Sequence, residues 1–416
     1  MRVLWIAPNG GNYKNNILKG TGGWIGALQV ELLKYFPELE LGIVFPAHET
    51  NIVQDGNISY YPLQICTGNK LVRYLKNYFV SNIIIDRIFV KKVLKIIEEF
   101  HPDLVHVWGT ESMYASVIPF IKYPFIVHIQ GFTTEIVKRY IPNDFTISDL
   151  IKCDLPIRYF CKLGSFHQYK VMKYQALREL RVSSYVKYWI GRTDWDYDIS
   201  QFLSPGSIYY HCNELMRVDF NNSLWSYHYN GTLFIQSTIT DSWYKGIDVI
   251  LKTAKVLLEN QISFIWNVYG VNVSSRILRR ISNKLSITPD SVNVHFWGRV
   301  DGERIRNGLL QSDVYVHPSY IENSSNAIAE SMMIGVPTIA LSVGGNSSML
   351  KENSGILVSP TNIINLANYI SQMSDKEIAK SFSSRALMVS KDRQNSAKTI
   401  SDLVQIYNKV LNAYKS

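Results

Sequence analysis

Short apolar runs alternate with amphipathic stretches along almost the whole chain. In the first half these runs lie at residues 2–8, 41–46, 103–109, 125–131 and 188–193. In the second half they lie at residues 231–237, 264–270, 293–299, 313–319, 337–341 and 355–360. They are rich in Val and Ile and lack polar alternation, which predicts strands of parallel sheets buried on both faces. Between them apolar residues recur at helical spacing, as over 24–36, so the pattern predicts an α/β protein.

The length of 416 residues is too great for one hydrophobic core, because domains usually hold roughly 100 to 200 residues. Two successive doubly wound domains account for it. The least regular stretch is 220–231, rich in Asn, Ser and Gly. We therefore expect a Rossmann-like domain over residues 1–226, a second over 227–395, and a closing helix over 396–416.

Positive charge gathers between residues 151 and 190, within a formal net charge of +9. This stretch holds eight lysines and arginines but only two acids, Asp154 and Glu179. Eight aromatic residues lie among these charges. An anionic partner suits this composition: an acidic membrane surface or a pyrophosphate-linked lipid. The alternative is a long helical stretch with a solvated basic face and buried aromatics.

The four cysteines, Cys66, Cys153, Cys161 and Cys212, show no CxxC spacing, so neither a zinc site nor a disulfide framework is indicated. No apolar run approaches the roughly 18 residues of a membrane span, and the apolar start is too short for a signal peptide. We expect a cytoplasmic protein, soluble or peripheral on the inner face of the membrane.

A glycine turn, "GTGGWIG" at residues 20–26, follows the first strand and opens a helix. Glycines let the backbone approach a ligand, and free N–H groups at a helix start favour phosphate. On this ground Gly22 and Gly23 are candidate donor-binding residues. The spacing is not GxGxxG, and a purely structural turn is the alternative.

A pair of acids, Glu322 and Glu330, stands in "HPSYIENSSNAIAESMMIGVPTIALSVGG" at residues 317–345. Capping residues around Ser325 and the later Gly335 predict a helix between them. Glu322 then lies in the loop before the helix, and Glu330 about one and a half turns inside it. Loop amides and the helix dipole offer an anion site between two acids that can hold hydroxyl groups. The alternative is a solvated loop acid and a helix acid paired with a lysine.

This stretch resembles the donor-site signature of family 4 glycosyltransferases, retaining enzymes of the GT-B fold, with Ser331 where the family usually has Ala. The "TGG" at 21–23 looks like the family's acceptor-side glycine loop, and "WYKGIDVIL" resembles its lysine-glycine element. "IGRTDWD" and "YYHCNELMR" look like phrases of bacterial surface-polysaccharide transferases. The resemblance spans about residues 1–400. It implies two Rossmann-like domains facing a cleft and a last helix that packs on the first domain.

The resemblance also implies roles for single residues. Glu330 would hold the nucleotide ribose, and Glu322 would lie beside the transferred sugar. Amides around Ser325 and Asn326 would meet the diphosphate or the sugar, and Asn323 belongs to the same donor-binding set. Lys245 would neutralise the leaving diphosphate, because negative charge builds there as the anomeric bond breaks.

Two departures from the family pattern stand out. Ser237 and Thr238 occupy the positions where Gly-Arg is usual, so a second cation would come from Arg299 or Arg192. The family's active-site histidine aligns with Gln130, while His128 lies two residues earlier, on the same side of the strand. Both are candidate catalytic residues, and for His128 a place in the core is the alternative.

A metal site is not expected. "DWD" at residues 194–196 resembles an Asp-x-Asp metal motif, but it lies at a predicted helix start, where acids favour the helix dipole. The nine histidines show no HxxxH or HxH pair. The implied substrate is a nucleotide diphosphate sugar, with no cofactor.

The sequence thus predicts metal-independent, retaining transfer of a sugar to a growing bacterial surface glycan of the capsule, O-antigen or exopolysaccharide kind. The expected partners are the nucleotide sugar, a glycan or lipid-pyrophosphate-linked oligosaccharide acceptor and the inner membrane surface, with no nucleic acid. Two alternatives stay open: a sugar-nucleotide 2-epimerase of similar fold, and a non-catalytic nucleotide-sugar binding partner in glycan assembly.

Overall fold

The computed structural model describes residues 1–15, 23–64, 82–216, 220 and 223–415. The chain forms two compact units that are not continuous in sequence. The first comprises Met1–Thr134, Val171–Arg217 and Gln394–Ser416, and the second comprises Glu135–Lys170 and Val218–Arg393.

The described part of the first unit is built on an eight-stranded sheet of order β3-β4-β2-β1-β5-β6-β7-β8. Its strands are β1 (Arg2–Ile6), β2 (Glu40–Pro46), β3 (Val53–Asp55), β4 (Ile58–Leu63), β5 (Leu104–Trp108), β6 (Phe125–His128), β7 (Tyr188–Gly191) and β8 (Ile208–His211). All pairs are parallel except β3 with β4. The five strands predicted for the first half are confirmed, and β3, β4 and β8 are additions.

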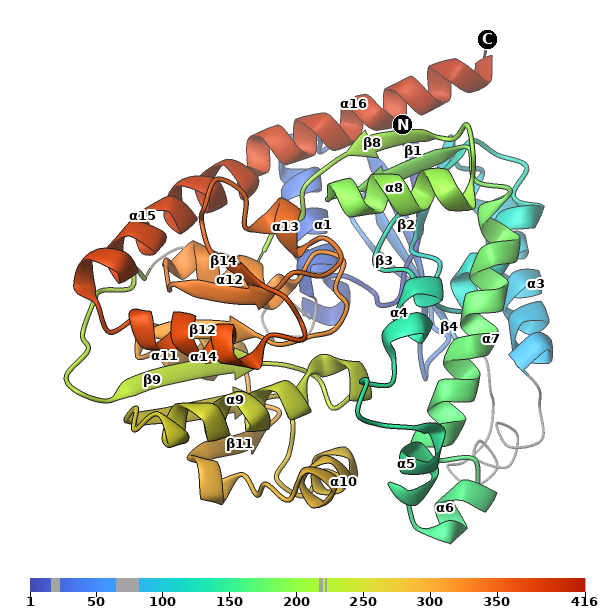
Figure 1. Ribbon diagram of the computed structural model, residues 1–416. Helices are drawn as coiled ribbons and strands as arrows, with labels where there is room; N and C mark the ends of the chain where they lie inside the picture. The colour runs from blue at the N-terminus through green and yellow to red at the C-terminus, as the bar shows by residue number, and fades with distance from the viewer. Residues whose placement is uncertain (16–22, 65–81, 217–219, 221–222, 416) are drawn as a thin grey trace. The chain divides into compact units, whose positions relative to one another are not determined.

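Helices cover both faces of this sheet (Figure 1). They are α1 (Gly23–Tyr35), α3 (Asn82–Phe100), the 3-10 helix η2 (Met113–Phe120), α8 (Asp194–Leu203) and α16 (Ser396–Lys415). Two more, α4 (Thr133–Arg139) and α7 (Ser165–Ser183), run across the boundary between the units. Alternate residues of each strand face opposite sides. Leu4 and Val105 join the core under α3, whereas the Trp5 indole on the other face donates to the Tyr407 hydroxyl of α16 at 3.2 Å.

The second unit contains a parallel sheet of order β11-β10-β9-β12-β13-β14. Its strands are β9 (Leu233–Thr238), β10 (Phe264–Tyr269), β11 (Val294–Gly298), β12 (Val314–His317), β13 (Thr338–Leu341) and β14 (Ile356–Val358). All six were predicted. The order reverses between β9 and β12, because the chain passes from the edge strand β11 back to the middle of the sheet. This position is the switch point at which open α/β sheets bind ligands.

Helices pack on both faces of the second sheet as well. On one face α9 (Ile247–Glu259) contacts α10 (Arg276–Leu285) and α14 (Ile363–Gln372). On the other, α12 (Asn326–Ile334) contacts α11 (Gly302–Leu310) and α15 (Lys376–Arg393). The predicted α/β architecture with two parallel sheets is therefore observed.

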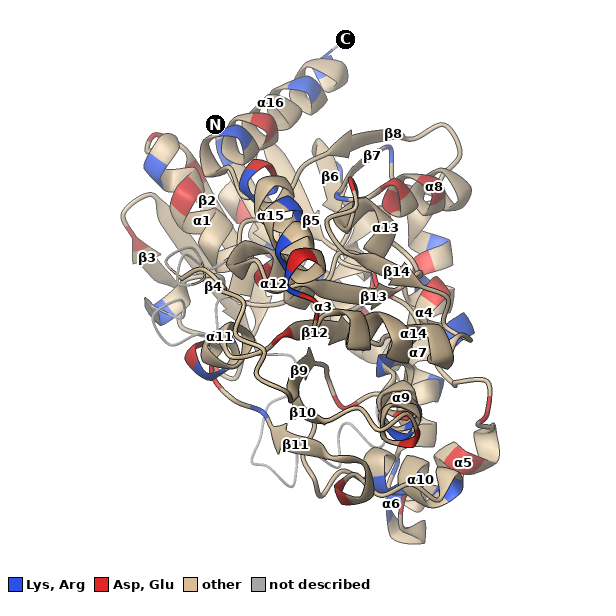
Figure 2. Ribbon diagram, turned by 60° about the vertical axis from the view of Figure 1, so that its left-hand side comes forward, with Lys and Arg blue, Asp and Glu red and all other residues tan. Residues whose placement is uncertain are grey.

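An excursion from the first half of the chain, residues 135–170, belongs to the second unit. It carries α5 (Ile147–Lys152) and α6 (Pro156–Phe160), and α5 lies beside the basic α10 (Figure 2). The buried Asp149 accepts from Arg280 at 2.6 Å and from Lys284 at 2.7 Å. Burial alone would raise the pKa of Asp149, but these two cations hold it well below its usual range. The excursion is thus fixed to the second unit by charge.

The polar stretch near the predicted domain boundary also packs on the second unit. The Trp225 backbone N–H donates to the Ile334 carbonyl at 2.8 Å, and its indole donates to the Ser312 carbonyl at 2.7 Å. In the described ranges we find no helix long and apolar enough to cross a membrane.

Candidate functional site

The carboxyl ends of β9 and β12 meet at the switch point of the second unit. After β9 the chain turns through the 3-10 helix η4 (Trp243–Lys245) into α9, and after β12 a loop leads into α12. The loops that follow neighbouring parallel strands lie at the same edge of the sheet, and ligands bind at this edge in open α/β sheets. Most of the predicted donor-site residues lie in these two connections.

An ion pair joins the two connections. The Lys245 ammonium lies 2.5 Å from Glu322 Oε1, and His317 Nε2 lies 3.0 Å from the same oxygen. Burial alone would raise the pKa of Glu322, but the Lys245 charge and the His317 hydrogen bond hold it well below its usual range. Burial would likewise lower the pKa of Lys245, and the Glu322 charge raises it instead. Both groups are therefore charged at neutral pH.

Two glycines allow the loops to approach so closely. Gly246 has a φ of 78°, and a Cβ there would lie 2.0 Å from the Pro318 carbonyl oxygen. Gly344 has a φ of 51°, and a Cβ there would lie 1.8 Å from the Glu322 carbonyl oxygen. Only glycine fits such positions without strain. The lysine-glycine and glycine-glycine elements of the sequence thus hold the backbone on either side of Glu322.

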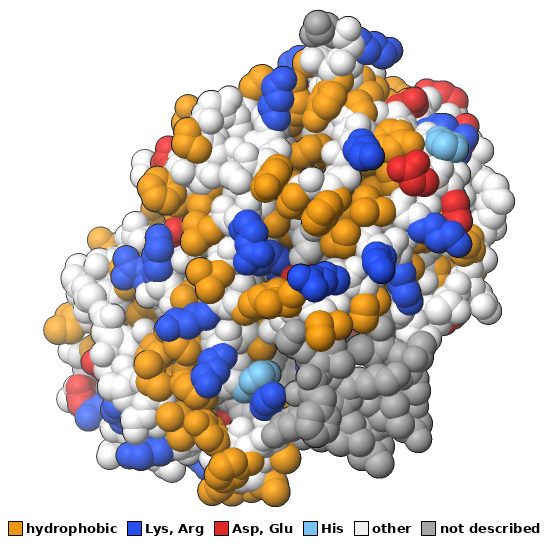
Figure 3. All heavy atoms as spheres, turned by 90° about the vertical axis from the view of Figure 1, so that its right-hand side faces the viewer, with side chains coloured by type: hydrophobic (Ala, Val, Ile, Leu, Met, Phe, Trp, Pro, Cys, Tyr) orange, Lys and Arg blue, Asp and Glu red, His pale blue; other side chains and the backbone are white. Residues whose placement is uncertain are grey.

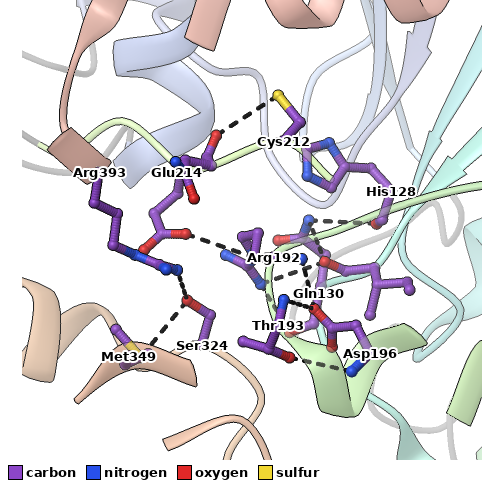
Figure 4. Close-up of polar contacts among 12 residues, drawn as sticks. His128, Gln130, Arg192, Thr193, Asp196, Cys212, Glu214, Ser324, Met349 and Arg393 are labelled. Carbon is purple, nitrogen blue, oxygen red and sulfur yellow. Dashed lines mark hydrogen bonds and ion pairs between the residues drawn. The ribbon is translucent and has the colours of Figure 1, made fainter. Parts of the chain in front are cut away.

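The start of α12 follows the prediction from capping residues. The Ser325 hydroxyl accepts from the Ile328 N–H at 3.4 Å, and Gly335 ends the helix with a φ of 86°. Arg393 Nη2 donates to the Ser324 hydroxyl at 3.0 Å and so fixes the residue before the cap (Figure 4). Asn326, the first helical residue, is exposed. The free N–H groups of this first turn favour an anion.

Buried polar atoms without partners occur at the same strand ends. Within the described residues, neither polar atom of the Asn323 amide has a hydrogen-bond partner, nor have the hydroxyls of Ser319 and Thr238. Thr238 is the last residue of β9, and Ser319 and Asn323 lie in the loop after β12. Because buried polar groups are nearly always paired in native proteins, such a group marks a place where water or a ligand binds.

Glu330 lies on the second turn of α12 and is buried. Burial raises the pKa of the Tyr315 hydroxyl well above its usual range, and the charges of Glu330 and Glu322 raise it further. The charges of both acids therefore raise the pKa of one side chain of β12, Tyr315. That the two acids flank one ligand site stays a prediction.

Other residues named in the sequence analysis are not part of these two connections. Arg299 is exposed after β11, and β10 separates that strand from β9. The Ser237 hydroxyl makes its hydrogen bonds inside the sheet, where it donates to the Val316 carbonyl at 2.7 Å and accepts from the Trp266 indole at 3.0 Å.

In the predicted glycine turn, Gly22 falls outside the described residues. Gly23 is exposed and begins α1 with a φ of 58°.

His128 of the first unit belongs to an aromatic core. Its ring is stacked 4.9 Å from Trp108 and 5.3 Å from His106, and it meets Trp24 edge-on at 5.2 Å. The side chain has no exposed surface, and burial lowers its pKa, so the ring is neutral. We assign His128 to the core, which is the alternative that the sequence left open.

Gln130, just after β6, is only partly buried, and its amide makes two long hydrogen bonds of 3.4 Å to the carbonyls of His128 and Ile129. Arg192 donates to the Ile129 carbonyl at 3.3 Å and lies 3.9 Å from the Glu214 carboxylate (Figure 4). Both ends of that ion pair are buried. These contacts of Arg192 therefore all lie within the first unit.

The two acids of "DWD" lie in the first turn of α8. Asp196 Oδ2 accepts from the N–H groups of Arg192 at 2.7 Å and Thr193 at 3.1 Å, so it closes the capping box of α8. Burial raises the pKa of Asp196 to about 6. Asp194 is exposed in the first turn. In the part of the chain that the structure describes, no group of three His, Cys, Asp or Glu residues is placed to hold a metal ion.

Glu111 is a candidate that the sequence interpretation missed. It follows β5, and a Cβ on Gly109 would lie 2.0 Å from Glu111 Oε2 and 2.9 Å from Gln130 Cγ. The two side chains therefore pack around Gly109. Burial, with a smaller contribution from the Glu179 charge, raises the pKa of Glu111 to about 8. The signal was present in "VWGTE", an acid placed directly after a buried strand.

Sequence comparisons match parts of the chain. Residues 230–398 match the family model "Glycosyl transferases group 1". Protein CapJ of Staphylococcus aureus is 30% identical over 139 residues, which is 33% of this chain and 34% of CapJ. The putative teichuronic acid biosynthesis glycosyltransferase TuaC of Bacillus subtilis (strain 168) is 32% identical over 83 residues, 20% of this chain and 21% of TuaC. The chain thus spans about a third and a fifth of the length of these relatives.

Solved structures resemble the chain along its whole length. Sucrose-phosphate synthase from Thermosynechococcus elongatus has a TM-score of 0.70 at 14% identity, covering 99% of this chain and 100% of that one. Anabaena HepE, solved in complex with UDP and glucose, has a TM-score of 0.63 at 13% identity, with 98% and 99% covered. At these identities the likeness concerns the fold, and the predicted GT-B fold is confirmed.

Proposed function

We propose that the protein is a retaining glycosyltransferase that moves a sugar from a nucleotide diphosphate donor to a growing bacterial surface glycan. The observation that carries the proposal is the group at the switch point of the second unit. There a buried Lys245–Glu322 ion pair, the unpartnered Asn323 amide and the start of α12 lie together. The match of residues 230–398 to group 1 glycosyl transferases supports it.

Each part of this group suits one part of the donor. The charge of Lys245 stabilises the diphosphate as it leaves the anomeric carbon. The N–H of Ser325 donates to Met349 Sδ at 3.1 Å, so the N–H groups from Asn326 onward would bind diphosphate oxygens. Glu330 would accept from the ribose hydroxyls. Glu322 lies beside the sugar and keeps Lys245 charged, since burial alone would lower the pKa of that lysine. No metal ion is required in this scheme.

The proposed reaction breaks the bond between the anomeric carbon and the diphosphate oxygen, and the acceptor oxygen forms a bond to the same face. The acceptor hydroxyl gives its proton to the departing diphosphate, so the anomeric configuration is retained. In the first unit Gln130 and Glu111, which follow the carboxyl ends of β6 and β5, would hold the acceptor. The assignment of the acceptor as a bacterial surface glycan is supported by similarity to TuaC, whose name refers to teichuronic acid biosynthesis.

The proposed acceptor is lipid-linked, which would bring the enzyme to an anionic membrane surface on the cytoplasmic side. The segment with α5 and α6 supports this, because Leu155, Ile157 and Phe160 are 61%, 66% and 70% exposed. The acids of this segment are neutralised: Asp154 is buried and lies 3.1 Å from Arg158 and 3.3 Å from Arg276. Positive charge around exposed apolar side chains favours anionic lipid.

Vesicle flotation tests the membrane assignment. Wild type should float with phosphatidylglycerol vesicles and not with phosphatidylcholine vesicles. The double variant Ile157→Ser, Phe160→Ser should lose most of this binding. Ile364→Ser, which removes a 71% exposed side chain on α14, should bind as wild type does. Equal flotation of all three proteins would contradict the assignment.

A donor screen tests the transferase. The purified protein is incubated with a panel of nucleotide diphosphate sugars, with and without lipid-linked oligosaccharide, and products are identified by mass spectrometry. We expect nucleotide release with at least one donor, and NMR of the glycoside should show the donor's anomeric configuration. A sugar nucleotide isomerised without acceptor would indicate the 2-epimerase. Donor binding without turnover would indicate a non-catalytic partner.

A further inference from the structure

A cavity of about 530 Å³ lies in the first unit, between α3, η2 and α7. It is lined mainly by apolar atoms. The face that carries α3 and α7 shows apolar side chains interleaved with lysines and arginines (Figure 3). The proposed donor-binding residues of the second unit are not among the lining residues of this cavity.

A buried ion pair between Arg178 and Asp86 forms one wall of the cavity. Arg178 Nη1 lies 3.2 Å from both oxygens of Asp86, and the Tyr174 hydroxyl donates to Asp86 Oδ2 at 2.9 Å. Both charged residues are buried. Arg178 Nε has no hydrogen-bond partner among the described residues, and neither has the buried hydroxyl oxygen of Ser116 in the same lining. Polar groups that could hold a ligand are therefore buried beside this space.

Three exposed cations, Arg87, Lys91 and Arg181, belong to the same lining. Asp86 is the one acid among the described lining residues, and Arg178 already neutralises it. The lining is therefore positive. The apolar side chains of Ile83 and Phe120 are 51% and 55% exposed. Large exposed apolar groups beside unneutralised cations suit a ligand with an anionic head and an apolar chain.

The cavity is connected to the acceptor side of the unit. Arg178 Nη2 donates to the carbonyl of Glu111 at 2.9 Å. Glu111 in turn packs with Gln130 around Gly109, at the carboxyl ends of β5 and β6. One arginine therefore contacts both the cavity and the loop assigned to the acceptor. A molecule held at the cavity by its phosphate would place its next group near that loop.

We propose that this cavity binds the phosphate and the first isoprenoid units of a polyprenyl phosphate lipid, the carrier of the acceptor. Arg87, Lys91 and Arg181 would contact the phosphate oxygens, and Ile83, Val90 and Phe120 would contact the chain. The inference rests on the proposed function for its biological role, but the binding itself does not. A nucleotide fits less well, since a base requires several hydrogen-bonding partners and this lining offers few uncharged polar groups.

Calorimetry with a short lipid tests the proposal. The probe is farnesyl phosphate below its critical micelle concentration, compared with farnesol, inorganic phosphate and UDP. We expect farnesyl phosphate to bind at least about tenfold more tightly than farnesol or inorganic phosphate. UDP, which the proposed donor site binds, should not compete with farnesyl phosphate. Equal affinity for inorganic phosphate would reduce the site to a phosphate site. Equal or tighter binding of UDP that the cavity variants abolish would identify a nucleotide site. Either result overturns the proposal.

Variants locate the binding. Arg87→Gln, Lys91→Gln, Arg181→Gln together should weaken farnesyl phosphate at least about tenfold, and Phe120→Ser should weaken farnesyl phosphate but not inorganic phosphate. Lys95→Gln, which removes an exposed α3 cation paired with Glu99 outside the lining, should bind as wild type does. Unchanged affinity in the triple variant contradicts the proposal. Donor hydrolysis measured in the same preparations reports separately on the transferase.

Discussion

Asn323 holds both polar atoms of its side-chain amide in a buried position just after β12, without a hydrogen-bond partner among the described residues. A buried amide in that state costs free energy unless water or a ligand pairs with it. Asn346, which follows β13, is also buried, and its Oδ1 likewise has no partner among the described residues, but its Nδ2 donates to the Leu341 carbonyl at 2.9 Å. The two residues therefore differ in one hydrogen bond within the fold, which Asn346 makes and Asn323 does not.

Asn323→Ala should therefore raise the KM for the sugar nucleotide about tenfold, which corresponds to the loss of one well-made hydrogen bond. The free energy of unfolding should stay the same or rise, because the alanine removes no bond within the protein. Asn346→Ala is the matched control and should lower stability by about 1 to 2 kcal/mol. Donor kinetics and urea denaturation check both. A loss of stability in Asn323→Ala without a change in KM would assign Asn323 to the fold.

Glu111 offers a prediction on pH. Its pKa is raised from 4.5 to about 8, chiefly by burial, so the folded state binds a proton there that the unfolded state has released. Stability should therefore fall as the pH rises from about 4.5 toward 8. In Glu111→Gln this dependence is absent, so the variant should gain stability relative to wild type between pH 5 and pH 8. Glu98→Gln, an exposed change on α3, should follow wild type. A constant difference between Glu111→Gln and wild type would refute the prediction.

The positions of candidate residues in the fold were predictable where a motif contained them. The spacing of Glu322 and Glu330 and the resemblance around Lys245 led to side chains that the structure groups at one sheet edge. Asn323 could be included only as a member of that motif, because the lack of a partner is a property of the packing. His128 shows the opposite limit, since its burial depends on Trp24 and Trp108, which are distant in sequence.

Secondary structure elements followed from periodicity where both faces of a strand are buried. All six strands of the second unit appear in the sequence as mainly apolar runs, with ends that differ by a few residues. One of them, the edge strand β11, alternates buried and exposed residues. The three strands that were missed, β3, β4 and β8, lie toward the edges of their sheet and are partly exposed. Their sequences, such as "VQD", carry polar residues and give no continuous apolar signal. Exposure therefore explains why these strands were missed.

The turn after β9 depends on Gly246, and a matched glycine tests this. Gly246 and Gly206 have φ values of 78° and 80°, but a Cβ on Gly246 would meet the Pro318 carbonyl, whereas one on Gly206 would meet nothing within 4 Å. Gly206→Ala should cost only the backbone strain, about 1 to 2 kcal/mol. Gly246→Ala should cost more and also slow donor turnover, because it separates Lys245 from Glu322. Equal thermal stability and turnover in the two variants would disprove this role.

At the scale of the whole molecule, length and alternation predicted two α/β units but not the path of the chain between them. Residues 135–170 join the second unit through contacts such as Asp149 with Arg280, which are 131 positions apart. Such charge pairs leave no periodic signal in one sequence. The last helix, α16, contributes the Tyr407 hydroxyl to the aromatic face of the first unit. The helix itself was expected from the sequence pattern, but its packing on the first unit could be expected only from the resemblance to a known family.

The central claim is that the second unit uses Lys245 to stabilise a departing nucleotide diphosphate. The most direct measurement is the rate of nucleotide release from the active donor by Lys245→Ala, with folding checked by circular dichroism. By comparison with the removal of a single donor to a developing anion, we expect turnover to fall by about 10² to 10³. Lys255→Ala, which removes an exposed lysine paired with Glu259 on α9, should keep the wild-type rate. A folded Lys245→Ala that turns over donor at the wild-type rate would contradict the account.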